Sequence, residues 1–402
     1  MKHLAVVGGG FAGLWATLCA AREFWLAGEE AHLTLVSRDE FLTVRPRLYE
    51  AFTPQMRVPL APILSAVGAE LLVGEVTRVD LSYRRLDVVT GDGMTRGAHY
   101  ACLVLATGSE QRPLPLPGVA THAFDIDTYA AAERLEHHLQ TLVGGSRDPA
   151  ALTVVIVGAG FTGIELATGM RARLRAMVGD AIAAAARVVL VERASTVGPE
   201  LGLAPQSHLL AALEASGVEV LLDSGITAVT ADGVQLTNGQ HIATRTVVIT
   251  TGLMAAGLGT TLGVACDALG RVEVDRHLRV AACETLFAAG DAAHAQVDAT
   301  HFALMSCQHA VPMGKHAGYN AARDLLGLPL REYQQPDYVT CLDLGDYGAL
   351  LSSGWAREPV QWGPEVKALK RTINTQWIYP PAATHTALMA AADLDAPWPP
   401  PT

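Results

Sequence analysis

Two sets of three glycines are spaced as in loops that bind phosphate groups. Gly8, Gly10 and Gly13 follow an apolar run at residues 4–7, and residues 14–23 then favour a helix. A strand, a glycine-rich turn and a helix N-terminus present free backbone N–H groups and a positive dipole to a pyrophosphate. The glycines permit the tight turn, the close approach of the phosphates and the packing of helix on strand. The pattern predicts a dinucleotide site at the start of the chain.

The same pattern returns in the middle of the chain. A second apolar run at residues 153–157 precedes Gly158, Gly160 and Gly163, and another helical segment follows. Self-similarity of this kind indicates a repeated structural unit. The sequence therefore predicts two nucleotide-binding units.

Each unit continues in the same order after its helix. A second strand, an antiparallel meander (residues 71–100 and 218–239) and a final apolar strand are expected in both copies. The final strands end in Thr107-Gly108 and in Thr251-Gly252.

The end of the second strand is where a carboxylate usually holds a ribose hydroxyl. The second unit has Glu192 there, followed by Arg193, whereas the first unit has Ser37 and Arg38. Glu192 can accept hydrogen bonds from ribose hydroxyls and repels a 2′-phosphate, which favours NADH as the donor. Arg193 can accommodate a 2′-phosphate, so NADPH is also possible. Ser37 can still bond a ribose, and Arg38 can stack on an adenine.

Composition excludes several classes of function. Half of the 402 residues are hydrophobic, 17% are charged and 38 are glycine, as expected for an α/β enzyme with buried parallel strands. The net charge of −11 argues against a nucleic-acid partner. Six scattered cysteines without a C-x-x-C pair support neither disulfides nor a zinc site and suggest the cytoplasm. No apolar stretch is long enough to span a membrane.

The remaining segments complete the expected architecture. A strand at residues 285–289 precedes Gly290-Asp291, and a helix is expected over residues 302–326. The tail from residue 333 is rich in aromatic residues, with strands expected near 339–351 and a helix over 365–373. It should cover a face of the molecule or make a homodimer contact. The expected domains are residues 1–125 with 272–330, residues 150–271, and residues 331–402.

Several motifs resemble those of two-dinucleotide flavoprotein reductases, and within them the type II NADH dehydrogenase-like proteins. They are GGGFAG at 8–13, RPRLYE at 45–50, GAGFTGIELA at 158–167 and LFAAGDAA at 286–293. The resemblance implies an α/β fold with two Rossmann-like units, in which an NAD(P)H domain is inserted into an FAD domain. A small α+β domain would follow.

The resemblance also assigns cofactor-binding residues. Asp291 would hold the flavin's ribityl chain, and FAD and NADH would occupy the first and second units. Besides the glycines and strand-end residues named above, the expected cofactor-binding positions are Phe11, Ala12, Arg45, Pro46, Phe161, Thr162 and Gln308.

Three residues are expected near the reacting groups. Glu165 resembles a family glutamate at the junction of nicotinamide and flavin, where it would orient groups or relay a proton; the alternative is a carboxylate that favours the helix start. Gln308 matches one glutamine of the family's Ala-Gln-x-Ala-x-Gln segment, but Cys307 and Pro312 differ from it. Whether Cys307 is chemically active stays open.

The leading hypothesis is therefore an NADH dehydrogenase that reduces a quinone or a quinone-like small molecule, with membrane contact at most peripheral, on the inner face. The alternatives are a soluble flavin reductase component or a pathway-specific oxidoreductase acting on another metabolite or a partner protein. A third is a slow-turnover redox sensor that binds FAD and NADH. The histidines at 294, 301, 309 and 316 are not expected to bind a metal, although His301 and His309 can line the acceptor site.

Overall fold

The computed structural model describes residues 2–143 and 148–396. Its first unit is built on a parallel five-stranded sheet in the order β21-β9-β1-β2-β5. The strands are β1 (His3–Val7), β2 (His32–Ser37), β5 (Glu70–Val73), β9 (Cys102–Leu105) and β21 (Leu286–Ala288). β21 comes from the chain beyond the second unit and pairs with β9, so the second unit is inserted within the first.

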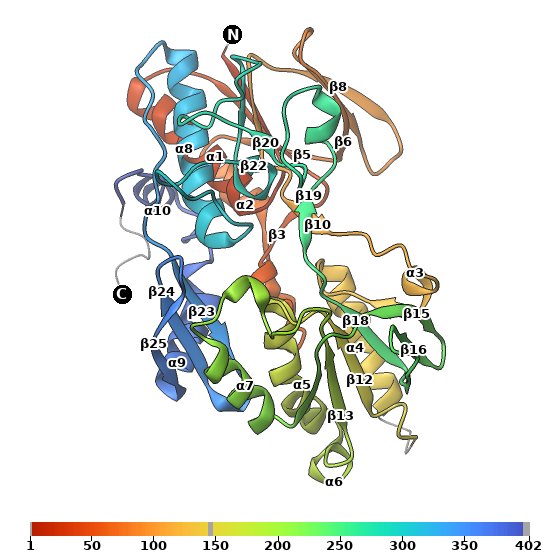
Figure 1. The fold of residues 1–402 in the computed structure, drawn as a ribbon. Helices are drawn as coiled ribbons and strands as arrows, with labels where there is room; N and C mark the ends of the chain where they lie inside the picture. The colour runs from red at the N-terminus through yellow and green to blue at the C-terminus, as the bar shows by residue number, and fades with distance from the viewer. Residues whose placement is uncertain (1, 144–147, 397–402) are drawn as a thin grey trace.

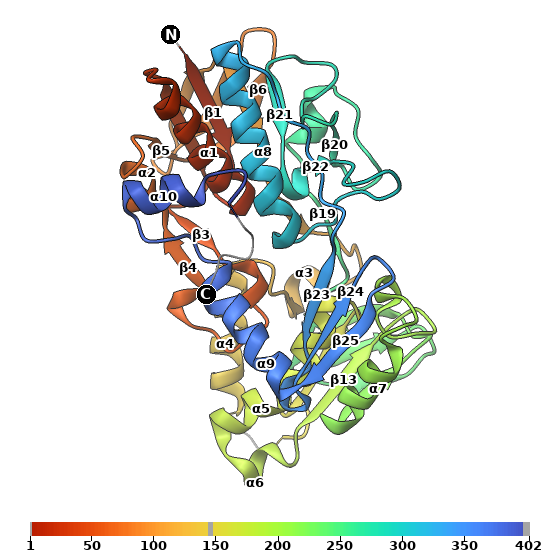
Figure 2. The ribbon, with the colours of Figure 1, turned by 90° about the vertical axis from the view of Figure 1, so that its left-hand side faces the viewer.

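Two helices pack together against this sheet. α1 (Phe11–Ala27) and α8 (Cys307–Leu326) lie side by side (Figures 1 and 2). Their backbones approach closely because Gly318 faces α1: a Cβ there would lie 1.9 Å from the carbonyl oxygen of Ala16. This close packing places the start of α8, which carries the expected acceptor-side residues, next to the first glycine loop.

The second unit repeats the plan below the first in Figure 1. Its parallel sheet has the order β11-β18-β12-β13-β14. The strands are β11 (Ala123–Phe124), β12 (Thr153–Val157), β13 (Arg187–Val191), β14 (Val218–Leu221) and β18 (Thr246–Ile249). Its helices are α4 (Tyr129–Val143), α5 (Phe161–Val178), α6 (Asp180–Ala183) and α7 (Gln206–Ala215). The α/β class with two Rossmann-like units is confirmed, while the exact domain boundaries stay predictions.

The two predicted meanders begin differently from what was expected. In both units the first strand of the segment, β5 or β14, joins the parallel sheet instead. Both strands continue the buried sheet because they carry apolar residues and are reached through a helix, α2 (Leu60–Ser65) or α7. The meanders are β6 (Glu75–Asp80), β7 (Arg85–Val89) and β8 (Thr95–His99), and β15 (Ile226–Thr230), β16 (Gly233–Leu236) and β17 (His241–Ala243).

Short pairs of strands join the units and complete the first one. β10 (Ser109–Gln111) pairs antiparallel with β19 (Leu253–Ala255) and forms the connection in the middle of Figure 1. The other pairs are β3 (Phe41–Thr43) with β4 (Arg57–Pro59), and β20 (Val272–Glu273) with β22 (Ala293–His294). A four-residue helix, α3 (Val119–His122), precedes β11.

The C-terminal segment contacts both units. An antiparallel sheet of β23 (Val339–Asp343), β24 (Ala349–Ser353) and β25 (Glu358–Gly363) buries Leu342 and Leu350 in the core of the second unit. The helix α9 (Pro364–Thr372) continues into a π-helical turn at Ile373–Trp377, and α10 (His385–Ala391) packs on α1 (Figure 2). The expected tail helix is present, and β25 was not predicted. Among the described helices, none is long and apolar enough to cross a membrane.

Candidate nucleotide-binding and redox site

One large cavity lies where the two units and the C-terminal domain meet. Its volume is about 1240 Å³. The starts of α1, α5 and α8 all reach it, and the chain from β23 to the π-helical turn closes it. The predicted site residues that line it are Gly10, Phe11, Ala12, Arg45, Pro46, Gly108, Phe161, Thr162, Glu165, Gly252, Asp291, Cys307 and Gln308.

The other predicted residues stand behind the cavity wall or beside it. The structure does not place Gly8, Gly13, Ser37, Arg38, Thr107, Gly158, Gly160, Gly163, Glu192, Arg193, Thr251 and Gly290 among the lining residues. Most of them belong to the glycine loops and the strand ends, and their expected contacts with the cofactors stay predictions.

The first glycine loop has the geometry of a phosphate cradle. Gly8 has φ +120°, and a Cβ there would lie 2.0 Å from the carbonyl oxygen of Ala106. At Gly10, by contrast, a Cβ would meet no atom within 4 Å. The space beside the start of α1 is thus open, and a phosphate can approach the backbone N–H groups there.

The strand-end residues of the two units differ in their contacts. Ser37 is buried behind the first loop: a Cβ on Gly9 would lie 2.2 Å from its Oγ. Glu192 is also buried, and its two carboxylate oxygens accept hydrogen bonds from the backbone N–H groups of Ala159 (2.8 Å) and Ala194 (2.9 Å). Glu192 therefore fixes the second loop, and its expected contact with a ribose stays a prediction.

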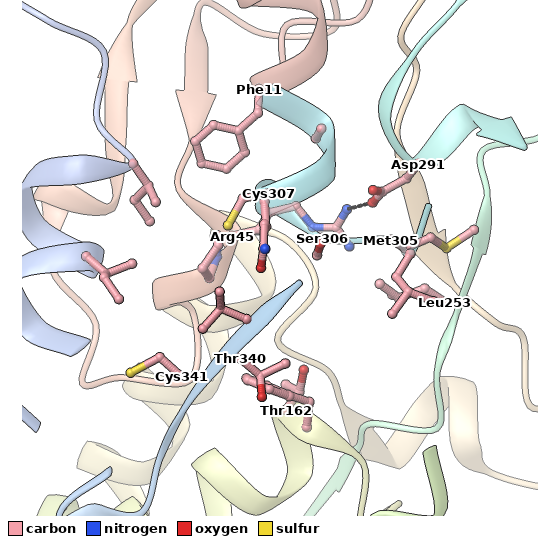
Figure 3. A pocket seen from close by; sticks show the side chains of 18 of the residues that line it. Phe11, Arg45, Thr162, Leu253, Asp291, Met305, Ser306, Cys307, Thr340 and Cys341 are labelled. Carbon is pink, nitrogen blue, oxygen red and sulfur yellow. Dashed lines mark ion pairs between the residues drawn. The ribbon is translucent and has the colours of Figure 1, made fainter. Parts of the chain in front are cut away.

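Asp291 lies in a polar cluster on the cavity wall. Ser109 Oγ donates a hydrogen bond to Asp291 Oδ2 at 2.6 Å, and Arg45 Nη1 lies 3.8 Å from the same oxygen (Figure 3). Arg45 also forms an ion pair with Asp127, which was not predicted. Burial raises the pKa of Asp291, while Arg45 and Ser109 oppose that shift. The cluster offers a carboxylate and a guanidinium side by side for a polar cofactor.

A buried ion pair stands at the junction of the second unit and the C-terminal domain. Glu165 Oε1 lies 2.9 Å from Lys370 Nζ, and both side chains are buried. Burial raises the pKa of Glu165 to about 7, although Lys370 and the N–H of Asp343 act in the opposite direction. Burial lowers the pKa of Lys370, but Glu165 and the other acidic groups nearby outweigh this and raise it overall. A carboxyl with this pKa can take up and release a proton near neutral pH.

Lys370 was missed by the sequence analysis. It lies on α9, and its sequence context resembles that of Lys367, which is partly exposed and forms an ion pair with Asp343. The amphipathic pattern of the helix is the only sequence signal for a buried lysine. Its partner lies far away along the chain.

The RPRLYE motif attaches the C-terminal domain to the first unit. Tyr49 donates a hydrogen bond to Asp343 Oδ2 at 2.9 Å, and Glu50 Oε1 accepts one from Asn374 Nδ2 at 2.8 Å. Arg47 Nη1 donates to the hydroxyl of Tyr379 at 2.7 Å. These bonds join the motif to β23, the π-helical turn and the segment after it.

The expected acceptor-side residues lie at the start of α8. Burial raises the pKa of the Cys307 thiol to about 11, so the thiol stays protonated near neutral pH. When the oxygen and nitrogen of the Gln308 side-chain amide are exchanged, the amide makes two hydrogen bonds with the backbone of Val339. Its NH₂ group donates to the Val339 carbonyl (2.5 Å), and its oxygen accepts from the Val339 N–H (3.2 Å). A second thiol, Cys341, also lines the cavity and was not predicted (Figure 3).

The histidines considered for the acceptor site lie outside the cavity wall. His309 is fully buried and bonds Gln335 through Nδ1, and His301 pairs with Asp298 and stacks on Trp355 at 4.3 Å. Across residues 2–143 and 148–396, no group of three His, Cys, Asp or Glu side chains could hold a metal ion.

Comparison with known proteins identifies the class. The pyridine nucleotide-disulphide oxidoreductase family matches residues 2–314, and the chain belongs to this family. The protein is thus an oxidoreductase.

Individual relatives narrow the comparison further. The chain is 42% identical to an NADH dehydrogenase-like protein of Mycobacterium tuberculosis over 98% of both chains. It is 28% identical to the demethylphylloquinone reductase of Synechocystis over 87% of this chain and 86% of that protein. Among solved structures, NDH2 of Plasmodium falciparum in complex with NADH has a TM-score of 0.78 at 12% identity, covering 96% of both chains, which shows a shared fold.

Proposed function

We propose that the protein binds FAD in its first unit and NADH in its second, and that it reduces a quinone or a quinone-like small molecule. The observation that carries this proposal is the single cavity reached by both glycine loops. A donor nucleotide and a flavin bound to the two loops could meet there. The names of the mycobacterial and cyanobacterial relatives support the NADH and quinone assignments.

The first unit fits a flavin dinucleotide. The open space at Gly10 leaves room for a pyrophosphate, and the Arg45–Ser109–Asp291 cluster provides groups for a polar chain and ring. Gly8 to Gly13, Ser37, Arg45 and Asp291 would hold the cofactor. When bound, the flavin supplies the hydride-accepting and electron-transferring chemistry.

The acceptor side of the cavity is largely apolar. The side chains that line it there come from α8, the RPRLYE motif and the segment from α9 onward; they are Leu48, Pro312, Leu369, Ile373, Trp377 and Ile378. Such a surface suits a flat, poorly charged acceptor, because its apolar area is removed from water on binding.

Glu165 and Lys370 provide a group that holds a proton at the cavity wall. Reduction of a quinone to a hydroquinone consumes two electrons and two protons, and a carboxyl that titrates near neutral pH can deliver one of them. The ammonium group of Lys370 holds the Glu165 carboxyl in place and limits how far burial raises the pKa of Glu165.

The proposal is tested by identifying the cofactor and the products. We expect purified protein to release FAD on denaturation, and NADH to reduce a water-soluble menaquinone analogue with one hydroquinone formed per NADH consumed. Turnover that is negligible with every quinone, although NADH is bound, would favour the redox-sensing alternative. If turnover is rapid only with a partner protein or with another metabolite, the protein is instead a flavin reductase component or a pathway-specific oxidoreductase.

A further inference from the structure

The glycine loop of the second unit, unlike that of the first, is covered by a carboxylate. Glu200 lies on the 3₁₀ turn Pro199–Leu201, and its Oε1 accepts a hydrogen bond from the N–H of Phe161 at 3.0 Å. A Cβ placed on Gly160 would lie 2.6 Å from the same oxygen. The carboxylate therefore rests directly on the N-terminus of α5.

This position is the one that a nucleotide phosphate would need. The first N–H groups of a helix and its dipole favour an anion, and α5 has neither an acidic residue in its first turn nor a side-chain cap on Gly160. Glu200 supplies the missing negative charge from outside the helix. Two anions cannot share these N–H groups, because like charges at this distance repel each other.

The two loops thus differ in a way that matches two kinds of ligand. At the first loop the space beside Gly10 is empty of protein atoms, as suits a cofactor that stays bound. At the second loop a side chain of the protein already occupies the corresponding place. A ligand that binds and leaves in every cycle has to displace it.

A cation from the C-terminal domain borders the same place. Arg357, between β24 and β25, donates a hydrogen bond from Nη1 to the main-chain carbonyl of Glu200 and lines the cavity. Its Nε is shut off from solvent and has no hydrogen-bond acceptor. Its backbone has φ +52°, a conformation that non-glycine residues rarely adopt. The guanidinium is thus held by the main chain of Glu200 at the cavity wall, and one of its donors has no partner.

We propose that Glu200 and Arg357 set the affinity of the second unit for pyrophosphate-bearing nucleotides, in opposite directions. The Glu200 carboxylate occupies the phosphate position until the nucleotide displaces it, and Arg357 then provides a donor and a positive charge for the phosphates. This inference rests on the proposed NADH site. It makes Glu200 a specificity-determining residue that weakens binding and shortens the stay of the nucleotide.

Calorimetric titration of the flavin-loaded protein with ADP-ribose tests the proposal without any turnover. Glu200→Gln keeps the size of the side chain but removes its charge, so the Kd for ADP-ribose should fall at least about threefold. Arg357→Gln should raise that Kd by a similar factor. Adenosine, which has no phosphate, should bind all three proteins equally.

Two further variants separate charge and folding from the proposed competition. Glu214→Gln makes the same change of net charge on the exposed face of α7 and should leave the Kd unchanged. In Glu200→Ser the side chain is too short to reach the N–H of Phe161, so this variant should bind ADP-ribose more tightly, as Glu200→Gln does. Melting temperatures within a few degrees of the wild type would show that all variants fold.

The outcomes distinguish this inference from the proposed function. If the wild type binds ADP-ribose but Glu200→Gln and Glu200→Ser bind it equally well or less tightly, Glu200 is not a competitor and the inference is wrong. Equal tightening of adenosine binding would also overturn it, since the effect would not depend on phosphate. If the wild type binds neither ADP-ribose nor NADH, the nucleotide site itself is wrong.

Discussion

Glu165 and Lys370 form a 2.9 Å ion pair with both side chains buried, although they belong to the second nucleotide-binding unit and to the C-terminal domain. Removing one partner of such a pair leaves an uncompensated group in a low-dielectric environment, which is more destabilising than losing an exposed pair. The pair therefore couples the position of the C-terminal domain to the protonation of a group at the cavity wall.

Lys370→Met should lower the free energy of unfolding more at alkaline than at acidic pH. A carboxyl whose folded-state pKa is raised contributes stability below its unfolded pKa, and that stability is lost as the pH rises through the folded pKa. Without Lys370, burial raises the pKa of Glu165 beyond about 7. We expect an additional loss of about 1.4 kcal/mol per pH unit above neutrality, measured by urea unfolding between about pH 6 and pH 8. Lys367→Met is the matched control and should show no such slope.

Glu165→Gln should change the pH dependence of acceptor reduction. If the Glu165 carboxyl delivers a proton, the wild-type rate of quinone reduction falls as the pH rises through about 7. The glutamine variant has no proton to deliver, so its rate should be lower and nearly flat over the same range. Pre-reduced protein mixed with a quinone in a stopped-flow instrument gives this rate. An unchanged profile in the variant would assign the ionisation to another group.

Glu192→Ala should narrow the preference for NADH over NADPH. A carboxylate near a 2′-phosphate repels it by roughly 4 kcal/mol at 4 Å with an effective dielectric near 20, and solvent reduces this value. We expect the ratio of kcat/KM for NADH to that for NADPH to fall about tenfold. The loss of the bonds to Ala159 and Ala194 should also weaken binding of both nucleotides. If kcat/KM falls equally for NADH and NADPH, so that their ratio is unchanged, Glu192 only shapes the loop.

Cys307→Ser should leave flavin reduction and turnover within about twofold of the wild type. Desolvation raises the pKa of this partly buried thiol to about 11, and thiol chemistry requires the thiolate. Cys341 lines the same cavity with its pKa also raised to about 11, so Cys341→Ser should behave alike. Rates of both half-reactions check this expectation, and a loss of more than tenfold in either variant would point to a reacting thiol.

What the sequence predicted correctly depends on local patterns. The glycine loops, the buried strands β1 and β12 and the helices after them follow from residues that are close together along the chain. The repeat then determined the fold class. β5 and β14 were misassigned because a short apolar strand is equally compatible with a meander and with a parallel sheet.

The parts of the site that were missed depend on distant contacts. Lys370 reaches Glu165 only because α9 folds back on the second unit, and Asp127 reaches Arg45 across the junction of the two units. Glu200 is an ordinary glutamate in the sequence and becomes notable only where it meets α5. Gln308 was predicted at the cavity, but its bonds to Val339 could not be foreseen before β23 was placed.

We propose that electrons pass from NADH through this protein to a quinone. The most direct test is anaerobic stopped-flow mixing of the flavin-loaded protein with NADH, followed by mixing with a menaquinone analogue or with oxygen. We expect rapid bleaching of the flavin by NADH and reoxidation by the quinone at least as fast as steady-state turnover, with slower reoxidation by oxygen. Rapid bleaching followed by equally slow reoxidation with both would contradict a quinone acceptor.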